Sequence, residues 1–231
     1  MSERKAPDNK ETGYKLKNAE LNNVTGLLEV KKTTLFIKRL FDVSVSTLSI
    51  LVLAAFFIII AIIIKANSEG PVFYKQTRVG KNGRLFKILK FRTMVVDADK
   101  KGRQITVGDD SRITNAGKFL RKAKIDELPQ IINIIIGDMS FVGPRPEVPK
   151  YVEMYNETQR QVLLVRPGIT DIASIEYRNE SDVLAGSSDP ERLYVEEIMP
   201  IKLNYNLQYI KSISLFNDIK LIISTVLKVL K

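Results

Sequence analysis

The stretch VSVSTLSILVLAAFFIIIAIII, residues 43–64, decides how this chain is organised. Its 22 residues include no charged residue, no proline and no glycine, and residues 50–64 include no polar side chain. As a helix the stretch would be about 33 Å long, close to the roughly 30 Å hydrocarbon core of a bilayer. A core helix of this length normally shows a polar stripe. We therefore expect residues 43–64 to insert into a membrane. A cleaved signal peptide is not expected, because 42 residues precede the stretch and no small-residue cleavage site follows it.

The flanks of this stretch leave two membrane topologies open. Residues 1–42 carry nine Lys/Arg and six Asp/Glu, and residues 65–92 carry eight Lys/Arg and one acid. Basic residues favour the cytoplasmic side, so both flanks favour the same side. A re-entrant helix, which enters and leaves through one leaflet, would satisfy both. A single straight span is the alternative, because Ala54 and Ala55 are good helix formers and no Pro or Gly supplies a break.

Composition narrows the chemistry that the rest of the chain can perform. The 231 residues are 45% apolar and 27% charged, with a formal net charge of +10 and no His, Cys or Trp. This excludes disulfides, thiolate metal sites, a Ser–His triad and a typical zinc site. An enzyme would have to use Asp, Glu, Lys, Tyr, Ser or Thr. The basic excess points to anionic partners such as phosphates, nucleic acid or an acidic membrane face.

Beyond the apolar stretch, turn residues and periodicity predict a small, mainly helical α+β domain. The β-hairpin signal is two apolar segments joined across a Gly-rich turn, and the last helix could pack in the core or lie in the membrane interface. The expected segments are a polar tail at 1–32, strands at 72–78 and 85–94, a polar loop at 97–112, helices at 118–124, 126–136 and 150–164, and a final helix from 215.

The adjacent carboxylates Asp126 and Glu127 are the strongest candidates for catalysis. The pattern places Asp126 at the N-cap of the helix 126–136, where the helix dipole would keep it ionised. An ionised carboxylate can attack phosphorus or bind Mg²⁺, and Glu127 could then act as a general base or as a second metal group. Plain helix capping would explain the same two residues.

Several basic residues could hold a diphosphate or a lipid phosphate, since arginine forms forked contacts with phosphate. Arg145 stands out, because Pro144 and Pro146 fix the backbone on both sides of it. A solvated face or attraction to a membrane surface is the simpler explanation for most of them. The candidates are Arg78, Lys90, Arg92, Arg121 and Arg145.

Taken together, these segments resemble a known family. In order, the chain reads KRLFD, the apolar stretch, GPVFYKQTRVGKNGRLFKILKFRTM, GKFLRKAKIDELPQ, GDMSFVGPRPE and RPGIT. This closely resembles the monotopic phosphoglycosyl transferases, also called bacterial sugar transferases, from about residue 36 to near the C-terminus. Residues 1–32 lie outside the resemblance.

The resemblance implies transfer of a sugar-1-phosphate from a UDP-sugar to polyprenyl (undecaprenyl) phosphate, with release of UMP. Such a reaction begins the assembly of a surface glycan, exopolysaccharide or glycoconjugate at the cytoplasmic face of the bacterial inner membrane. The family's nucleophile, which forms a covalent phosphosugar intermediate, corresponds to Asp126, and its dyad partner to Glu127. Mg²⁺ is implied as cofactor, with Asp126 as a ligand. Arg145 corresponds to the phosphate-facing arginine, and Lys90 and Arg121 to basic positions near the site; Arg78 is a further substrate-binding candidate.

The polar tail at 1–32 lies outside the resemblance. For the rest, the family fold implies a re-entrant membrane helix at 33–65 and a membrane-associated cytosolic domain with interfacial amphipathic helices at 66–231. Membrane lipid is an implied partner, nucleic acid is not, and homo-oligomerisation stays open. Two departures stand out: Ala54 and Ala55 replace a common Ser-Pro break, and DIASIEYRNE follows RPGIT in place of a Gly-Trp-type segment. The competing hypothesis is a membrane-anchored basic binding module without enzymatic activity.

Overall fold

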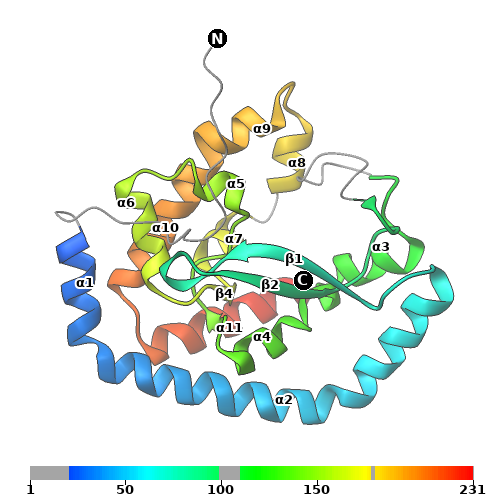
Figure 1. The fold of residues 1–231 in the computed structure, drawn as a ribbon, viewed down its shortest axis with the longest axis horizontal. Coiled ribbons are helices and arrows are strands. Elements are labelled where there is room, and N and C mark those ends of the chain that lie inside the picture. Colours follow the sequence, from blue (N-terminus) through cyan, green and yellow to red (C-terminus); the bar gives the residue numbers. More distant parts are fainter. Residues whose placement is uncertain (1–20, 99–109, 178–179, 231) are drawn as a thin grey trace.

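The computed structural model describes residues 21–98, 110–177 and 180–230, and within them helices dominate (Figure 1). Residues 1–20 of the expected tail and 99–109 of the expected loop lie outside the described residues. The elements are α1 (Leu21–Val30), α2 (Lys32–Asn67), β1 (Phe73–Val79), η1 (Lys81–Gly83), β2 (Leu85–Phe91), α3 (Asn115–Lys122), η3 (Ile125–Glu127), α4 (Gln130–Ile136), β3 (Ser140–Val142), α5 (Pro149–Val152), α6 (Glu157–Arg160), η4 (Gln161–Leu164), β4 (Gly168–Thr170), α7 (Ile172–Glu176), α8 (Glu180–Ala185), α9 (Pro190–Leu193), the π-helical η5 (Tyr194–Ile198), α10 (Met199–Lys211) and α11 (Leu215–Leu230).

The apolar stretch lies within a single 36-residue helix, α2, which no Pro or Gly interrupts. Figure 1 shows α2 following the lower edge of the molecule and then turning upward on the right. The hydroxyl groups of Ser46 and Thr47 donate to the carbonyl oxygens four residues earlier, a contact that often bends helices. Among the described residues, α2 alone is long and apolar enough to cross a membrane, and only 11% of its most apolar window is buried.

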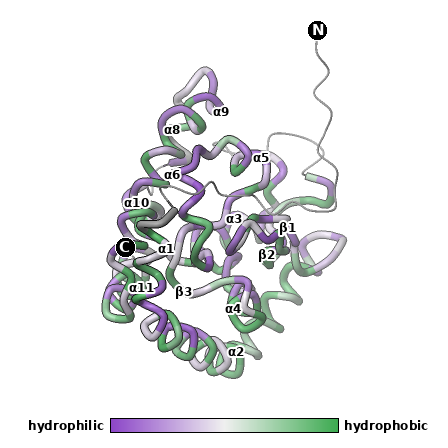
Figure 2. Tube along the Cα trace, turned by 60° about the vertical axis from the view of Figure 1, so that its left-hand side comes forward, coloured by the Kyte–Doolittle hydropathy of each residue, from purple (hydrophilic) through white to green (hydrophobic). Residues whose placement is uncertain are grey.

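The exposure pattern of α2 is inverted relative to a soluble protein. Its N-terminal half buries the polar side chains of Lys38, Asp42 and Ser46, which lie four residues apart on one face. Large aliphatic side chains such as Leu51 and Val52, both 72% exposed, cover the outside. Figure 2 shows α2 along the lower edge of the molecule, with much of its trace in the colour of hydrophobic residues. Polar groups inside and apolar groups outside are typical of a helix that contacts lipid.

The predicted β-hairpin is confirmed. Strands β1 and β2 pair antiparallel, from Phe73 opposite Phe91 to Val79 opposite Leu85. Two backbone groups on the outer edge of β2 find hydrogen-bond partners on α4. The Asn133 side chain accepts from the Leu89 N–H (2.9 Å) and donates to the Lys87 carbonyl (2.8 Å). Asn133 therefore fixes the hairpin against the helix that follows Asp126 and Glu127.

A second, two-stranded parallel pair was not predicted. Strand β3 lies beside β4, with Ser140 opposite Gly168 and Val142 opposite Thr170. The pair brings the segments GDMSFVGPRPE and RPGIT together. A Cβ atom on Gly168 would lie 2.1 Å from the Gly143 nitrogen, so this contact requires glycine.

The single helix expected at 150–164 is wrong. The chain forms α5, α6 and η4 in succession, because Asn156 and Gln159 build a capping box that starts a new helix within the segment. The last helix is present as α11. One side of it packs against β3, β4, α2 and α7, while Phe216 (77%) and Ile223 (54%) are exposed. The interpretation as a packing helix is therefore confirmed for one face, and the position in the membrane interface stays a prediction.

Candidate active site

Asp126 and Glu127 lie in a short 3₁₀ turn, η3, rather than at the start of a long helix. The expectation that Asp126 caps a helix over 126–136 is therefore wrong. Lys124 precedes the turn in the left-handed conformation (φ 56°), and Pro129, which has no N–H to donate, separates η3 from α4. This geometry buries Asp126, 8% exposed, beneath the end of the β-hairpin.

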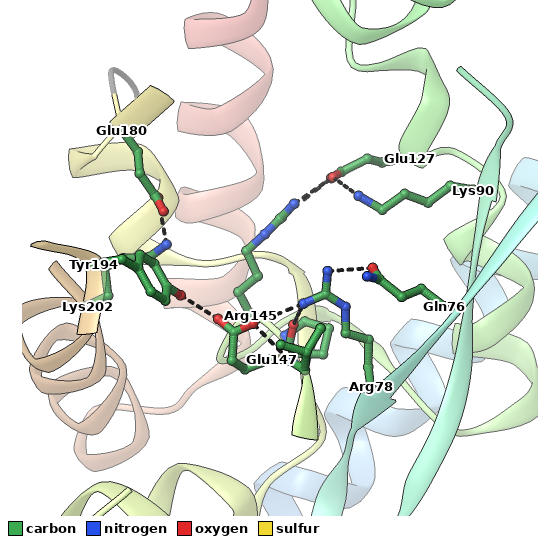
Figure 3. A network of polar contacts seen from close by, with 11 residues as sticks. Gln76, Arg78, Lys90, Glu127, Arg145, Glu147, Glu180, Tyr194 and Lys202 are labelled. Carbon is green, nitrogen blue, oxygen red and sulfur yellow. Dashed lines mark hydrogen bonds and ion pairs between the residues drawn. The ribbon is translucent and has the colours of Figure 1, made fainter. Parts of the chain in front are cut away.

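Glu127 is held by two cations that come from different parts of the fold (Figure 3). The Lys90 Nζ atom on β2 donates to Glu127 Oε1 at 2.8 Å. Arg145 donates to the same oxygen through Nη2 at 2.6 Å and to Oε2 through Nη1 at 3.5 Å. The Glu127 side chain is 14% exposed and that of Lys90 is 20% exposed, so this ion pair is largely desolvated; the Arg145 side chain, 36% exposed, also contacts solvent. The two ion pairs join the hairpin, η3 and the Pro-Arg-Pro turn at one point.

The two carboxylates consequently have opposite pKa shifts. Burial raises the pKa of Asp126, and the charges of Lys90, Arg121 and Lys124 only partly oppose this effect. Burial also acts to raise the pKa of Glu127, but the charges and hydrogen bonds of Arg145 and Lys90 outweigh it and hold this pKa well below its usual value. Glu127 is thus a fixed anion, whereas neither Lys90 nor Arg145 donates to Asp126 among the described contacts.

The predicted basic residues fall into two groups. Lys90 and Arg145 contact the dyad directly, and the charge of Arg121 on α3 acts on Asp126. Arg78 instead donates to Glu147 Oε1 (3.1 Å) and to the Pro146 carbonyl (3.3 Å). Arg92 donates to the backbone carbonyls of Ser68 and Glu69, where α2 ends.

Sequence reasoning missed the acid at the centre of the second network, Glu147. It accepts from Arg78, from the Val148 N–H at 2.8 Å and from the Tyr194 hydroxyl (Figure 3). The network fixes the turn that carries Arg145. The signal for Glu147 was present, since this residue ends the quoted segment GDMSFVGPRPE. Tyr194 gave no signal, because it lies 47 residues further along the chain.

The described residues contain no cluster of three or more acidic side chains that could enclose a metal ion. Mg²⁺ commonly needs only one or two protein carboxylates when substrate phosphates complete its coordination. Asp126, a carboxylate that Lys90 and Arg145 leave without a hydrogen bond, fits that requirement; Glu127, held by both cations, fits it less well.

Comparison with known proteins gives a consistent result. Residues 33–231 match the sequence profile described as "Bacterial sugar transferase". The chain is 39% identical over 196 residues to a Klebsiella pneumoniae protein named UDP-glucose:undecaprenyl-phosphate glucose-1-phosphate transferase, covering 83% of this chain and 39% of the relative. It is 35% identical over 198 residues to an Aeromonas hydrophila UDP-N-acetylgalactosamine-undecaprenyl-phosphate N-acetylgalactosaminephosphotransferase, covering 84% of this chain and 44% of the relative.

A shorter relative matches over nearly its whole length. The exopolysaccharide production protein PSS of Rhizobium leguminosarum bv. phaseoli is 37% identical over 201 residues, which cover 83% of this chain and 94% of that protein. By contrast, the chain spans less than half the length of the Klebsiella and Aeromonas relatives.

Proposed function

The chain belongs to the bacterial sugar transferase family, and on that premise we propose that it transfers a sugar-1-phosphate from a UDP-sugar to polyprenyl phosphate, releasing UMP. The observation that carries the proposal is that the two carboxylates of the dyad differ in the hydrogen bonds they accept. Lys90 and Arg145 hold Glu127, while Asp126 lies beside it without a hydrogen bond from either cation. Relatives named as undecaprenyl-phosphate sugar-phosphate transferases support the same reaction class.

In the proposed first step, a carboxylate oxygen of Asp126 attacks the phosphorus atom that bears the sugar. A P–O bond forms to Asp126, and the P–O bond to the neighbouring phosphate breaks, so that UMP leaves with the electron pair. Arg145 and Lys90 place positive charge beside the reacting diphosphate, and Glu127 keeps both cations in position.

In the second step, a phosphate oxygen of the polyprenyl phosphate attacks the same phosphorus atom. The P–O bond to Asp126 breaks, the carboxylate is regenerated and a polyprenyl diphosphate sugar is formed. Dividing one displacement into two lets the nucleotide leave before the lipid binds. The product would be the first lipid-linked sugar of a surface glycan or exopolysaccharide.

We propose that Asp126 contributes to binding Mg²⁺ together with the substrate phosphates. When bound, this ion would neutralise charge on the diphosphate and on the departing phosphate. The basic residues around the dyad share that task, since four cations act on the two carboxylates: Lys90, Arg121, Lys124 and Arg145.

We further propose that α2 is a re-entrant helix and that the domain lies on the cytoplasmic face of the inner membrane. The two halves of α2 pack against one body: Lys38 pairs with Asp218 on α11, and Ile64 packs with Phe91 and Leu120. A straight span would have to pull one of these halves away. The exposed face of α11 supports an interfacial position for this helix.

The test is UMP release from a panel of UDP-sugars with undecaprenyl phosphate and Mg²⁺. We expect one donor to be turned over and Asp126→Asn to abolish both turnover and a radiolabelled sugar-phosphate adduct on the protein. Asp138→Asn, a matched change just after α4, should leave both intact. Full activity of the Asp126→Asn variant would show that Asp126 is not the nucleophile.

The competing proposal, a basic binding module without activity, rests on the net charge of +10 and the apolar helix. It gives no role to the two carboxylates, whereas Asp126 is buried and Glu127 is held beside it by Lys90 and Arg145. It predicts binding to polyanions that falls steeply with salt and no UMP release from any donor.

A further inference from the structure

A second basic site lies away from Asp126 and Glu127, in a pocket between the N-terminal half of α2, β3 and the segment that leads into β4. Its lining includes Arg39, Asp42, Lys81, Ser140 and Arg166. None of Lys90, Asp126, Glu127 and Arg145 lines it. The cavity is small, about 40 Å³, which leaves room for a group the size of a few water molecules.

The cations of this pocket repel one another. Burial lowers the pKa of Lys81, and the charge of Arg166 lowers it further. Burial likewise lowers the pKa of Arg166, with a further contribution from Arg39 that Asp42 only partly opposes. Of the four cations in the lining, Lys38 is paired with Asp218. The other three, Arg39, Lys81 and Arg166, surround one buried acid, Asp42, which already accepts a hydrogen bond from the Phe141 N–H. A bound anion would relieve this repulsion.

Capping of α4 explains part of the cluster but not all of it. Arg39 donates to the carbonyls of Ile134 (2.7 Å) and Ile135 (3.1 Å), and Arg166 donates through Nε to that of Gly137 (2.9 Å). Such contacts are favourable at the C-terminal end of a helix. The Arg166 Nη groups are not used in that bond. The Lys81 ammonium makes no hydrogen bond or ion pair with any residue of the described ranges, although the Lys81 carbonyl accepts from the Arg84 N–H.

The Ser140 hydroxyl is an independent indication that the pocket accepts a ligand. Ser140 is 1% exposed and lines the pocket, yet its Oγ atom has no hydrogen-bond partner within the described parts of the chain. A buried hydroxyl without a partner is destabilising, because it has lost its hydrogen bonds to water without gaining others. An anion oxygen in the pocket would satisfy it.

We propose that Lys81, Arg166 and Ser140 form a phosphate-binding site distinct from the dyad, and that its ligand is the phosphate group of a lipid. A phosphate group has the negative charge that three cations require and the acceptor oxygens that a hydroxyl and two cationic donors can share. The site is an addition to the proposed transferase chemistry and does not depend on it.

The position of the pocket on α2 favours a lipid as the source. Its α2 lining, from Leu35 to Asp42, ends immediately before the apolar stretch begins at Val43. On the same turns, Phe36 (70%) and Leu40 (60%) are exposed. If the apolar stretch is in the hydrocarbon core, the pocket lies at the level of the phosphate headgroups.

The experiment uses the full chain carrying Asp126→Asn, so that no turnover occurs and the dyad nucleophile is absent. One arm titrates inorganic phosphate by calorimetry. The other compares thermal unfolding in phosphatidylcholine nanodiscs with and without phosphatidic acid, because a ligand of the native state raises the unfolding temperature. Each arm is repeated with Lys81→Gln and Ser140→Ala, and with Lys75→Gln as the matched control. Lys75 is an exposed lysine on β1, outside the pocket.

We expect phosphatidic acid to stabilise the protein, and Lys81→Gln to weaken that binding roughly tenfold through loss of a charge-assisted hydrogen bond. Ser140→Ala should weaken binding without lowering the unfolding temperature in phosphatidylcholine alone. Binding of both phosphate sources, with losses confined to the pocket variants, also supports the site. Binding of inorganic phosphate alone supports the site and refutes the lipid source. Equal losses in Lys75→Gln and Lys81→Gln, or no binding in either arm, would overturn the proposal.

Discussion

At the scale of single residues, the site distinguishes two adjacent carboxylates by what surrounds them. Glu127 is fixed by Lys90 and Arg145, and its negative charge in turn fixes both cations. The charge of Glu127 also raises the pKa of Arg145, so this guanidinium stays charged throughout the working range. Buried, uncommitted carboxylates beside a fixed basic pair are well suited to nucleophilic attack on a phosphate. Asp126 meets that description.

The fork between Arg145 and Glu127 gives the first prediction. Arg145→Lys keeps the positive charge, but an ammonium group cannot donate to both oxygens of Glu127 as the planar guanidinium does. Glu127 is then held less firmly, so Lys90 and the diphosphate are positioned less precisely. We expect kcat/KM for UMP release to fall about 10- to 100-fold, corresponding to roughly 1.4–3 kcal/mol. Arg84→Lys, a change of the same type at an exposed position beyond β1, should have no effect. Equal activity of the two variants would show that the fork is dispensable.

Asp110 gives a prediction that depends on pH. Hydrogen bonds from Arg112, opposed by burial, lower the pKa of Asp110 to about 2. A depressed carboxyl pKa stabilises the fold above its unfolded value near 4, and this contribution is lost as pH falls toward 2. Asp110→Asn should therefore cost about 1–2 kcal/mol at neutral pH and almost nothing near pH 2. Thermal unfolding in detergent at several pH values measures this; a deficit that persists at low pH would contradict it.

The parts of the site that sequence could predict are those contained in short segments. Asp126 and Glu127 are neighbours, and Arg145 is marked by two prolines. Only the family resemblance placed Lys90 near the site; local patterns did not show that Lys90, 37 residues before Glu127, donates to it. Local patterns also did not show that Arg78 donates a hydrogen bond to Glu147. These contacts depend on how β1, β2 and η3 pack, which no local pattern encodes.

At the scale of elements, a helix or strand was predicted correctly where its apolar pattern was long. The prediction failed where a capping residue or proline inside the pattern began a new helix. The β-hairpin, α2 and α11 have patterns that extend over many residues. The helices expected at 126–136 and 150–164 contain internal start signals, Pro129 in one and the Asn156 capping box in the other. Apolar periodicity continues across such signals, so it overestimates helix length.

Asn133 gives the element-scale prediction, because it connects α4 to the edge of β2. It is 1% exposed and satisfies the Leu89 N–H and the Lys87 carbonyl. Asn133→Leu would leave both backbone groups without partners and should lower the free energy of unfolding by about 2–4 kcal/mol. Asn204→Leu, the same change at an exposed position of α10, should change it by less than about 0.5 kcal/mol. Similar unfolding temperatures for the two variants would show that the hairpin does not need this anchor.

At the scale of the whole molecule, both halves of α2 contact the same body although the helix is apolar on its outside. The N-terminal half contributes Lys38 and Arg39 to contacts with α11 and α4, and the C-terminal half packs Ile60 and Ile64 against the hairpin and α3. The helix therefore lies against the domain as a curved arm (Figure 1). If the apolar outer face of α2 is inserted into a bilayer, the rest of the molecule lies on one side of that bilayer only.

This arrangement predicts that the two flanks of α2 are on the same side of the membrane. The chain has no cysteine, so single-cysteine variants can be labelled without background. Val30→Cys, at a position that is 86% exposed before α2, and Arg84→Cys, in the hairpin turn after it, should both resist an impermeant maleimide in intact cells. Both should react after the membrane is permeabilised. Ala55→Cys, in the middle of the apolar stretch, should remain unreactive in both conditions because lipid shields it. Labelling of one flank in intact cells would instead establish a straight span, and then the contacts of one half of α2 with the domain could not exist in the membrane.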